Sequence, residues 1–212
     1  MEEKNQHYST QFPDVRFKTY SVSESLRRHL YFFKTASGVF SFKQMDLGTK
    51  VFIEHMKIPE DQSTLLDLGC GYGAIGIVLA YLKPKSTIYF TDTNKRALWC
   101  TRENIRHNLT ERTGKVFVLH GSYFKPLENK SVQFDGIYMN PPLRKGRREF
   151  LTLCEEIPQY LKSKGLFQFV IKKKMGAEYI LHYLTEHFSE FFEIIEVTYK
   201  RSGYWIFCLV SF

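Results

Sequence analysis

The chain has 212 residues, of which 43% are hydrophobic and 25% are charged. This composition is typical of a single globular domain and excludes a disordered chain. Thirty Lys and Arg stand against 22 Asp and Glu, for a formal net charge of +8. That excess favours an anionic partner such as nucleic acid, although charge alone leaves an ordinary basic protein equally open.

The chain contains no apolar run near the roughly 18 residues that would span a bilayer. Its first ten residues are polar and lack the apolar core of a secretory signal. We therefore expect a cytoplasmic protein with no membrane partner. The four cysteines, which stand singly among apolar residues, are Cys70, Cys100, Cys154 and Cys208. Because none has the spacing of a metal ligand set, we expect no metal site and predict that all four are core residues.

Residues 1–45 differ in pattern from the rest of the chain. They are rich in aromatic side chains and contain a turn signal at Ser37 and Gly38. We predict that they form a small strand-bearing cap, packed on a main domain of residues 46–212.

From residue 46 onward, strand-like and helix-like segments alternate. The predicted strands are residues 64–68, 86–92, 115–120, 134–139, 165–171, 192–200 and 204–212. The predicted helices are residues 74–81, 94–108 with Asn94 as N-cap, 148–161 and 177–188. This alternation is typical of a Rossmann-like, doubly wound α/β fold with a seven-stranded, mostly parallel sheet. The last two strands have no helix between them, so they must pair as a C-terminal antiparallel hairpin.

Glycines occupy alternate positions directly after the first of these strands. Residues 67–73 read DLGCGYG, so the backbone can turn sharply and approach a ligand closely. The helix that follows offers unpaired N–H groups at the sheet edge where ligands bind in such folds. Asp92 ends the next strand, where a carboxylate can accept two hydrogen bonds from a ribose diol.

The ligand of this loop has two candidates at this point. Gly71, Gly73 and Gly76 match the dinucleotide pattern, so NAD and S-adenosylmethionine (SAM) both stay open. Asp67 favours SAM, because a carboxylate before the loop can bind the positively charged methionine end but would repel a pyrophosphate. A tight turn that binds nothing is the third interpretation.

The fourth strand of the main domain ends in a second motif. Residues 139–143 read MNPPL. The prolines fix the backbone and hold the Asn140 side chain at the same sheet edge as the glycine loop. An amide oxygen and a main-chain carbonyl are two neutral acceptors, which suit an amine with two N–H groups. A proline turn that merely ends the strand is the alternative.

Together, the DLGCGYG loop and the NPP motif resemble class I SAM-dependent methyltransferases that act on an amino nitrogen. Four further segments make the sequence similar to the "methyltransferase small" family, which includes rRNA guanine-N2 methyltransferases. They are SGVFS at 37–41, DLGT at 46–49, NPPLRKG at 140–146 and KKKMGA at 172–177. The resemblance covers about residues 30–210, and the chain looks like the short, single-domain members.

The resemblance implies roles for individual residues. The implied cofactor-binding residues are Asp67, Gly69, Cys70, Gly71, Gly73, Asp92, Thr93, Ser122, Tyr123 and Asn140. The residues implied to receive the target amine are Asn140, Pro141, Pro142 and Leu143. The chain departs from the family twice. Residues 121–124 lack the acidic residue that binds the adenine amino group, leaving Ser122 as a weaker substitute. Leu143 replaces the aromatic residue of relatives that act on adenine or glutamine, which favours an rRNA-type enzyme.

Cations follow two of the predicted strand ends. The candidate RNA-binding residues are Arg144, Lys145, Arg147, Arg148, Lys172, Lys173 and Lys174. They either bind phosphates at the mouth of the site or form a solvated face. Tyr204 and Trp205 either stack on a base or belong to the core of the final hairpin.

The sequence therefore predicts an enzyme that transfers a methyl group from SAM directly to guanine N2 in ribosomal RNA. Its expected partner is ribosomal RNA or a ribosomal subunit, and its oligomeric state is open. The alternatives are a methyltransferase for adenine N6 or a protein glutamine amide, an NAD-dependent oxidoreductase, and a non-catalytic RNA-binding module.

Overall fold

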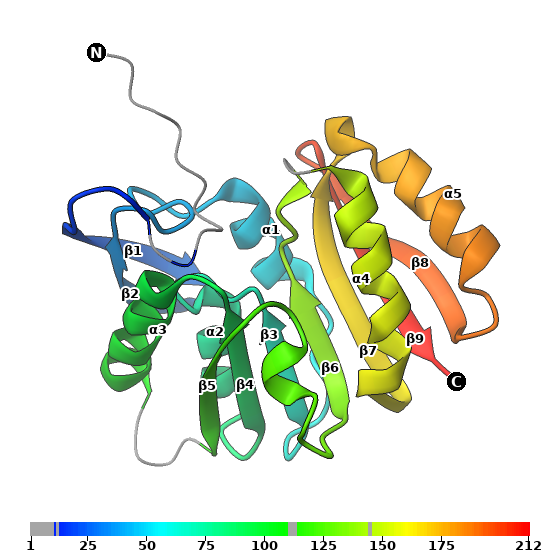
Figure 1. Cartoon of the computed structure of the whole chain (residues 1–212), viewed down its shortest axis with the longest axis horizontal. Coiled ribbons are helices and arrows are strands. Elements are labelled where there is room, and N and C mark those ends of the chain that lie inside the picture. Colours follow the sequence, from blue (N-terminus) through cyan, green and yellow to red (C-terminus); the bar gives the residue numbers. More distant parts are fainter. Residues whose placement is uncertain (1–10, 12, 110–113, 144–145) are drawn as a thin grey trace.

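The structure is a computed structural model that describes residues 11, 13–109, 114–143 and 146–212. A seven-stranded sheet with the order β5-β4-β3-β6-β7-β9-β8 runs through the molecule (Figure 1). Its strands are β3 (Thr64–Leu68), β4 (Thr87–Asp92), β5 (Val116–His120), β6 (Phe134–Met139), β7 (Leu161–Lys172), β8 (Phe192–Arg201) and β9 (Tyr204–Ser211). Only β9 runs antiparallel to its neighbours. The predicted mostly parallel sheet with a C-terminal hairpin is confirmed.

Helices cover both faces of this sheet. The first set is α1 (Leu47–His55), α2 (Ala74–Leu82) and α3 (Lys95–Asn108), and the second is α4 (Arg147–Tyr160) and α5 (Ala177–His187). Figure 1 shows α4 in front of the sheet and α2 behind it. Successive strand residues point to opposite faces, so Leu65 joins the core under the first set and Leu66 the core under the second.

A hairpin of β1 (Thr19–Leu26) and β2 (His29–Ala36) precedes the main sheet. Its two-residue turn places Arg27 at φ 49° and Arg28 at φ 66°, as a tight hairpin turn requires. The Arg27 guanidinium donates to the carbonyls of Ile53 and Met56 at the end of α1. The predicted strand-bearing cap is therefore present and shares a core with α1–α3. Its separation from the main domain at residue 45 stays a prediction.

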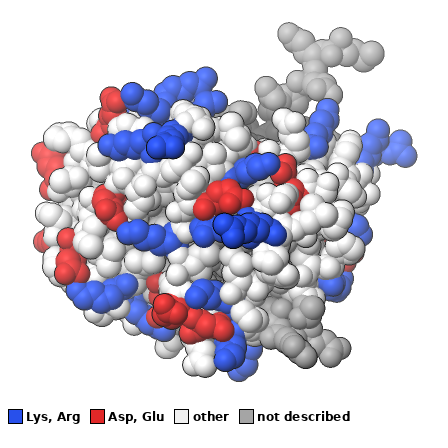
Figure 2. Space-filling view, turned by 180° about the vertical axis from the view of Figure 1, so that it is seen from behind, with Lys and Arg blue, Asp and Glu red and all other residues white. Residues whose placement is uncertain are grey.

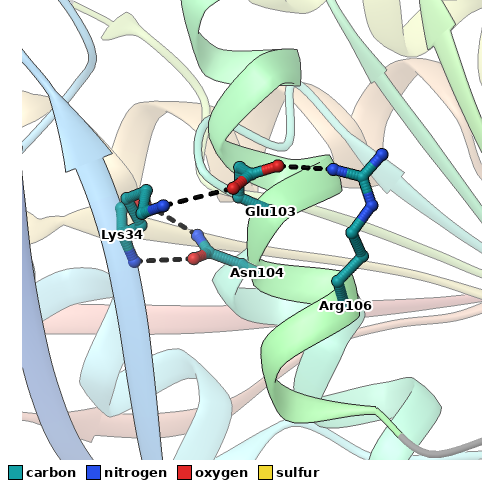
Figure 3. Close-up of polar contacts among 4 residues, drawn as sticks. All are labelled: Lys34, Glu103, Asn104 and Arg106. Carbon is teal, nitrogen blue, oxygen red and sulfur yellow. Dashed lines mark hydrogen bonds and ion pairs between the residues drawn. The ribbon is translucent and has the colours of Figure 1, made fainter.

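The hairpin docks on α3 through hydrogen bonds to Asn104 (Figure 3). Asn104 is fully buried. Its Oδ1 accepts from the Lys34 N–H at 2.6 Å and its Nδ2 donates to the Lys34 carbonyl at 2.9 Å. The same Nδ2 donates to the carbonyl of Tyr72, also at 2.9 Å. One side chain therefore joins the hairpin to the loop after β3.

An ion-pair chain lies beside this contact. Glu103 pairs with the Lys34 ammonium at 3.1 Å and with Arg106 (Figure 3). These groups are partly exposed, so their contribution to stability is small.

Most element boundaries follow from the sequence. Asn94 caps α3, its side chain accepting from two main-chain N–H groups, and Pro158 is tolerated in the last turn of α4. Helix α1 was not predicted, because its run Val51-Phe52-Ile53 is β-branched and aromatic and is equally typical of a strand. Strand β7 begins at Leu161, before the predicted residue 165.

The four cysteines are buried and unpaired with one another, which confirms them as core residues. Among the described residues, no helix is long and apolar enough to cross a membrane. Over the same part of the chain, no group of three or more His, Cys, Asp or Glu side chains is arranged to hold a metal ion.

Candidate active site

The carboxyl ends of β3, β4 and β6 surround a pocket of about 1100 Å³, part of it open to solvent. The predicted site residues that line it are Gly69, Cys70, Gly71, Asp92, Thr93, Ser122, Tyr123, Asn140, Pro141 and Pro142. The glycine loop and the NPP corner thus face the same pocket, although they lie far apart in the chain.

The glycines of the loop divide into two kinds. Gly69 and Gly71 have φ of 73° and 58°, and a Cβ on either would meet nothing within 4 Å. Their open side is a cradle in which a ligand can approach the main chain closely. Gly73, at φ 89°, instead packs against Thr101 and is the N-cap of α2. Gly76 is needed for packing, because its Cβ would lie 2.2 Å from the Phe90 ring.

Asp92 connects the end of β4 to the glycine loop. One carboxylate oxygen accepts from the Gly71 N–H and the other from the Asn94 N–H, both at 2.8 Å. Burial raises the pKa of Asp92 to about 6, although these N–H groups act to lower it. The carboxylate is therefore held rigidly where β4 meets the pocket, at a pKa below neutrality.

Asp67 does not line the pocket. It is 1% exposed, and its Oδ2 accepts from the Gly76 N–H in α2 at 2.8 Å. Its Oδ1 has no hydrogen-bond partner among the described residues, and burial raises its pKa to about 7. An unpaired buried carboxylate oxygen needs a donor. Its predicted link to the methionine end of the cofactor stays a prediction.

Asn140 is held from one side by two acceptors. Its Nδ2 donates to the Asp46 carboxylate at 3.1 Å and to the Thr49 hydroxyl at 2.9 Å. Both N–H bonds of the amide are used in this way, so its oxygen is available to another partner.

Leu143 does not share this position, although the sequence suggested that it would. It is 8% exposed, packs in the core beneath α4 and is not among the pocket-lining residues. The chain turns away at this point, with the Leu143 N–H donating to the Pro141 carbonyl at 2.9 Å. The predicted contact of Leu143 with the target amine therefore stays a prediction, which the position of its side chain in the core does not favour.

An acidic residue does line the pocket, from an unexpected element. Glu149 lies in the first turn of α4 and accepts from the Tyr123 hydroxyl at 2.9 Å. Burial and this hydrogen bond raise the pKa of Tyr123. The resemblance to the family predicted a carboxylate only after β5. Phe40 and Thr49 also line the pocket, and the motif segments 37–41 and 46–49 were the signal that could have found them.

The structure brings two of the predicted cationic clusters together. Arg147 begins α4, and its guanidinium lies against Gly176, which follows the short turn η3 (Lys173–Met175) at the end of β7. The same guanidinium lies 4.7 Å from the centre of the Tyr179 ring. The predicted cations that are exposed here are Arg147, Arg148, Lys172, Lys173 and Lys174. Arg144 and Lys145 lie outside the described residues.

Tyr204 and Trp205 are half-buried, with cations over their rings. The Lys172 ammonium lies 5.6 Å from the centre of the Tyr204 ring, and the Lys200 ammonium 4.4 Å from that of Trp205. Part of each ring is therefore in the core, and stacking of the rings on a base stays a prediction. On the face seen from behind, by contrast, basic and acidic side chains are interleaved (Figure 2).

Comparison with known proteins places this geometry in a family. The sequence matches the methyltransferase small domain over residues 30–208. The chain belongs to this family. It is a SAM-dependent methyltransferase, and SAM, not NAD, is its cofactor.

Two relatives and one solved structure illustrate the similarity. The uncharacterized protein YbxB of Bacillus subtilis is 33% identical, over 95% of this chain and 96% of that protein. The Shewanella denitrificans ribosomal RNA small subunit methyltransferase C is 32% identical over 65% of this chain, but only 39% of that protein is matched. The T. thermophilus 16S rRNA N2 methyltransferase RsmC, solved with AdoMet and guanosine, superposes with a TM-score of 0.77 at 20% identity. The match covers 94% of this chain and 52% of the RsmC chain, which shows a shared fold.

The residues of the pocket fit SAM. The cradle at Gly69 and Gly71 admits a ligand close to the main chain, and Asp92 presents a carboxylate at the end of the neighbouring strand. Among the described residues, Asp67 Oδ1 and the Thr91 hydroxyl are buried without hydrogen-bond partners.

This chain spans 39% to 48% of the length of the curated small subunit methyltransferases C that it matches.

Proposed function

We propose that this enzyme methylates the exocyclic N2 of a guanine in ribosomal RNA, in the cytoplasm. The observation that carries the proposal is that the Asn140 amide and the glycine loop line one pocket. The substrate class is supported by the relatives named ribosomal RNA small subunit methyltransferase C and by the structural likeness to an N2 methyltransferase.

In this proposal the pocket is divided into subsites. Gly69 and Gly71 lie along the methionine part of SAM, and Asp92 accepts hydrogen bonds from the ribose hydroxyls. Ser122 and the Tyr123–Glu149 pair lie at the adenine end, where Glu149 supplies the carboxylate that is missing after β5. Bound SAM supplies a methyl group on a sulfonium, an activated leaving group, so the protein needs no covalent nucleophile.

The role of Asn140 is to hold and orient the target amine. Guanine N2 is a poor nucleophile because its lone pair is delocalised into the ring. The Asn140 oxygen and a carbonyl of the proline corner accept its two N–H bonds and direct the lone pair toward the methyl group. Such positioning can lower the barrier by about 7 kcal/mol. The same oxygens stabilise the positive charge that develops on nitrogen as the bond forms.

The exposed cations beside the site bind the RNA backbone in this proposal. Arg147, Arg148 and residues 172–174 contact phosphates, and the target guanine leaves its stack to enter the pocket. The half-buried rings of Tyr204 and Trp205 lie beside these cations.

The direct test is methyl transfer from tritiated SAM, with unmodified ribosomal RNA and small ribosomal subunits as acceptors. Digestion and mass spectrometry of the nucleosides are expected to show N2-methylguanosine. DNA and a peptide release factor serve as competing acceptors. Label in N6-methyladenine or methylglutamine, with none in guanine, would refute the guanine assignment. Labelling of the subunit without labelling of naked RNA would identify the particle as the substrate.

A further inference from the structure

The Asn140 amide is held by two residues that the mechanism above does not use. Asp46 is the N-cap of α1 and Thr49 lies in its first turn, both almost a hundred residues away from Asn140 in the chain. The Asp46 carboxylate Oδ2 accepts from the Asn140 Nδ2 at 3.1 Å and from the Thr49 N–H at 2.9 Å. The Thr49 hydroxyl accepts from the same Nδ2 at 2.9 Å and donates to Asp46 Oδ2 at 3.4 Å.

These bonds select one of the two orientations of the amide. An ionised carboxylate can only accept hydrogen bonds, so the NH2 side must face Asp46, and a rotated amide would place its oxygen against the negative charge. The Thr49 hydroxyl proton is directed to Asp46, so its lone pair faces Asn140. Both N–H bonds of Asn140 are then used, and Oδ1 is the atom left for a substrate.

We propose that Asp46 and Thr49 are positioning residues for methyl transfer, which keep Asn140 Oδ1 directed at the target amine and strengthen it as an acceptor. The proposal rests on the function above. A negative charge behind the NH2 group polarises the amide toward its oxygen, since hydrogen bonds in a chain reinforce one another. The polarised oxygen interacts more favourably with the positive charge on nitrogen in the transition state than with the neutral amine before it.

The packing of α1 keeps this network in place. Asp46 is the N-cap of the helix, so one carboxylate oxygen both caps the N-terminus of α1 and accepts a hydrogen bond from Asn140. A Cβ at Gly48 would lie 2.7 Å from the Tyr204 ring and 2.8 Å from Asp46 Oδ2. Only glycine leaves room there for the helix to pack against β9 with the Asp46 carboxylate in this position.

Two substitutions separate positioning from folding. Asp46→Asn keeps an oxygen for the Thr49 N–H, and Asn is as good an N-cap as Asp, but it removes the charge behind Asn140. Thr49→Val keeps the shape and the capped N–H but removes the hydroxyl. Each is expected to lower kcat for RNA methylation about tenfold or more, with little change in the melting temperature or the Kd for SAM.

Matched variants complete the kinetic test. Thr49→Ser restores a hydroxyl and is expected to recover most of the activity that Thr49→Val loses. Thr185→Val removes an exposed hydroxyl on α5, which donates to the Leu181 carbonyl, and is expected to have wild-type activity. Full activity of Thr49→Val and Asp46→Asn would overturn the proposal, as would a loss that Thr49→Ser does not recover.

A spectroscopic measurement tests the orientation without any substrate. The side-chain amide signals of Asn140 in a ¹⁵N spectrum are assigned by their loss in Asn140→Ala. Asp46→Asn and Thr49→Val are expected to shift both proton signals, whereas Thr185→Val leaves them in place. Unshifted signals would overturn the inference. If the wild-type protein methylated none of the RNAs, the proposed substrate would fail, and this measurement would still decide whether Asp46 and Thr49 hold the amide.

Discussion

The two corners of the pocket are built in different ways. The corner after β3 is a run of consecutive residues whose main chain faces the ligand, with Gly69 and Gly71 open toward it. The corner after β6 depends on side chains from separate elements, since Asn140 is held by Asp46 and Thr49 of α1. The glycine loop can therefore recognise a ligand through its main chain. Orienting the Asn140 side chain, by contrast, requires residues that only the folded chain brings together.

The largest effect is expected at the corner after β6. Asn140→Ala removes the proposed acceptor of the amine and is expected to lower kcat about a hundredfold to a thousandfold, the range for losing one transition-state hydrogen bond. Calorimetry is expected to show SAM binding near the wild-type level. Asn129→Ala, in an exposed turn, is the control. Comparable loss of SAM binding in Asn140→Ala would remove the functional distinction between the corners.

At the corner after β3, substitution is expected to weaken SAM binding, whereas at the corner after β6 it is expected to lower kcat. Gly71→Ala places a methyl group in the cradle, at φ 58°. Because the methyl group overlaps the ligand only in the complex, the Kd for SAM is expected to rise about tenfold or more, which corresponds to ~1.4 kcal/mol. Gly203→Ala is the matched control, because Gly203 has φ 74° and open space but lies in the β8–β9 turn. Equal SAM affinity in the two variants would mean that the cradle does not receive the cofactor.

Acidification is expected to weaken SAM binding at the same corner. In the proposed function the ribose hydroxyls donate to Asp92, which would require its ionised form, and burial raises the pKa of Asp92 in the free protein to about 6. Above that pH the carboxylate is already ionised. Below it a proton must leave on binding, so SAM affinity is expected to fall by up to about tenfold per pH unit.

The variant Asp92→Asn separates this titration from that of Asp67, whose pKa is raised to about 7. It is expected to bind SAM more weakly and to lose the dependence near pH 6. The measurement is calorimetry between pH 5 and 8. An unchanged pH profile in Asp92→Asn would assign the titration to another group.

The smallest effect is expected at the rim of the site. Reversing charge in Arg147→Glu together with Arg148→Glu is expected to weaken RNA binding severalfold at moderate salt and to flatten its salt dependence, by roughly 0.7 in slope for each lost contact with a single strand. Lys85→Glu with Lys115→Glu, at the opposite edge where β4 and β5 begin, is the control pair. Filter binding over a range of salt concentrations measures both. Equal losses would indicate attraction by net charge alone.

The difference between the corners also explains which features could be predicted from sequence. Strands β3 and β6 have the predicted limits, and Asn94 caps α3 as expected, because these features depend on neighbouring residues. The glycine loop and Asp92 were found for the same reason. The meeting of the two motifs in one pocket followed from the rule that parallel strands end at a common edge.

The rest depends on contacts between distant residues. Nothing near Glu149 indicates that α4 brings it beside Tyr123, and nothing near Asp46 indicates a bond to Asn140. Leu143 was placed in the site by its position after the prolines, but the turn at Pro141 directs it into the core. Asp67 precedes the loop yet bonds with α2 behind it. The direction in which each of these side chains points depends on the packing of distant elements, so the neighbouring sequence did not determine it.

Asn104 bears on how far this enzyme can be shortened. Its one side chain bridges Lys34 of the hairpin and Tyr72 beside the cofactor cradle. A fragment that began at residue 46 would keep the DLGCGYG and NPP motifs but lose the SGVFS segment at 37–41. It would also leave a buried carboxamide without two of its hydrogen bonds, directly behind the glycines. The small hairpin therefore supports the glycine loop, and we expect that a shortened active enzyme would have to include it.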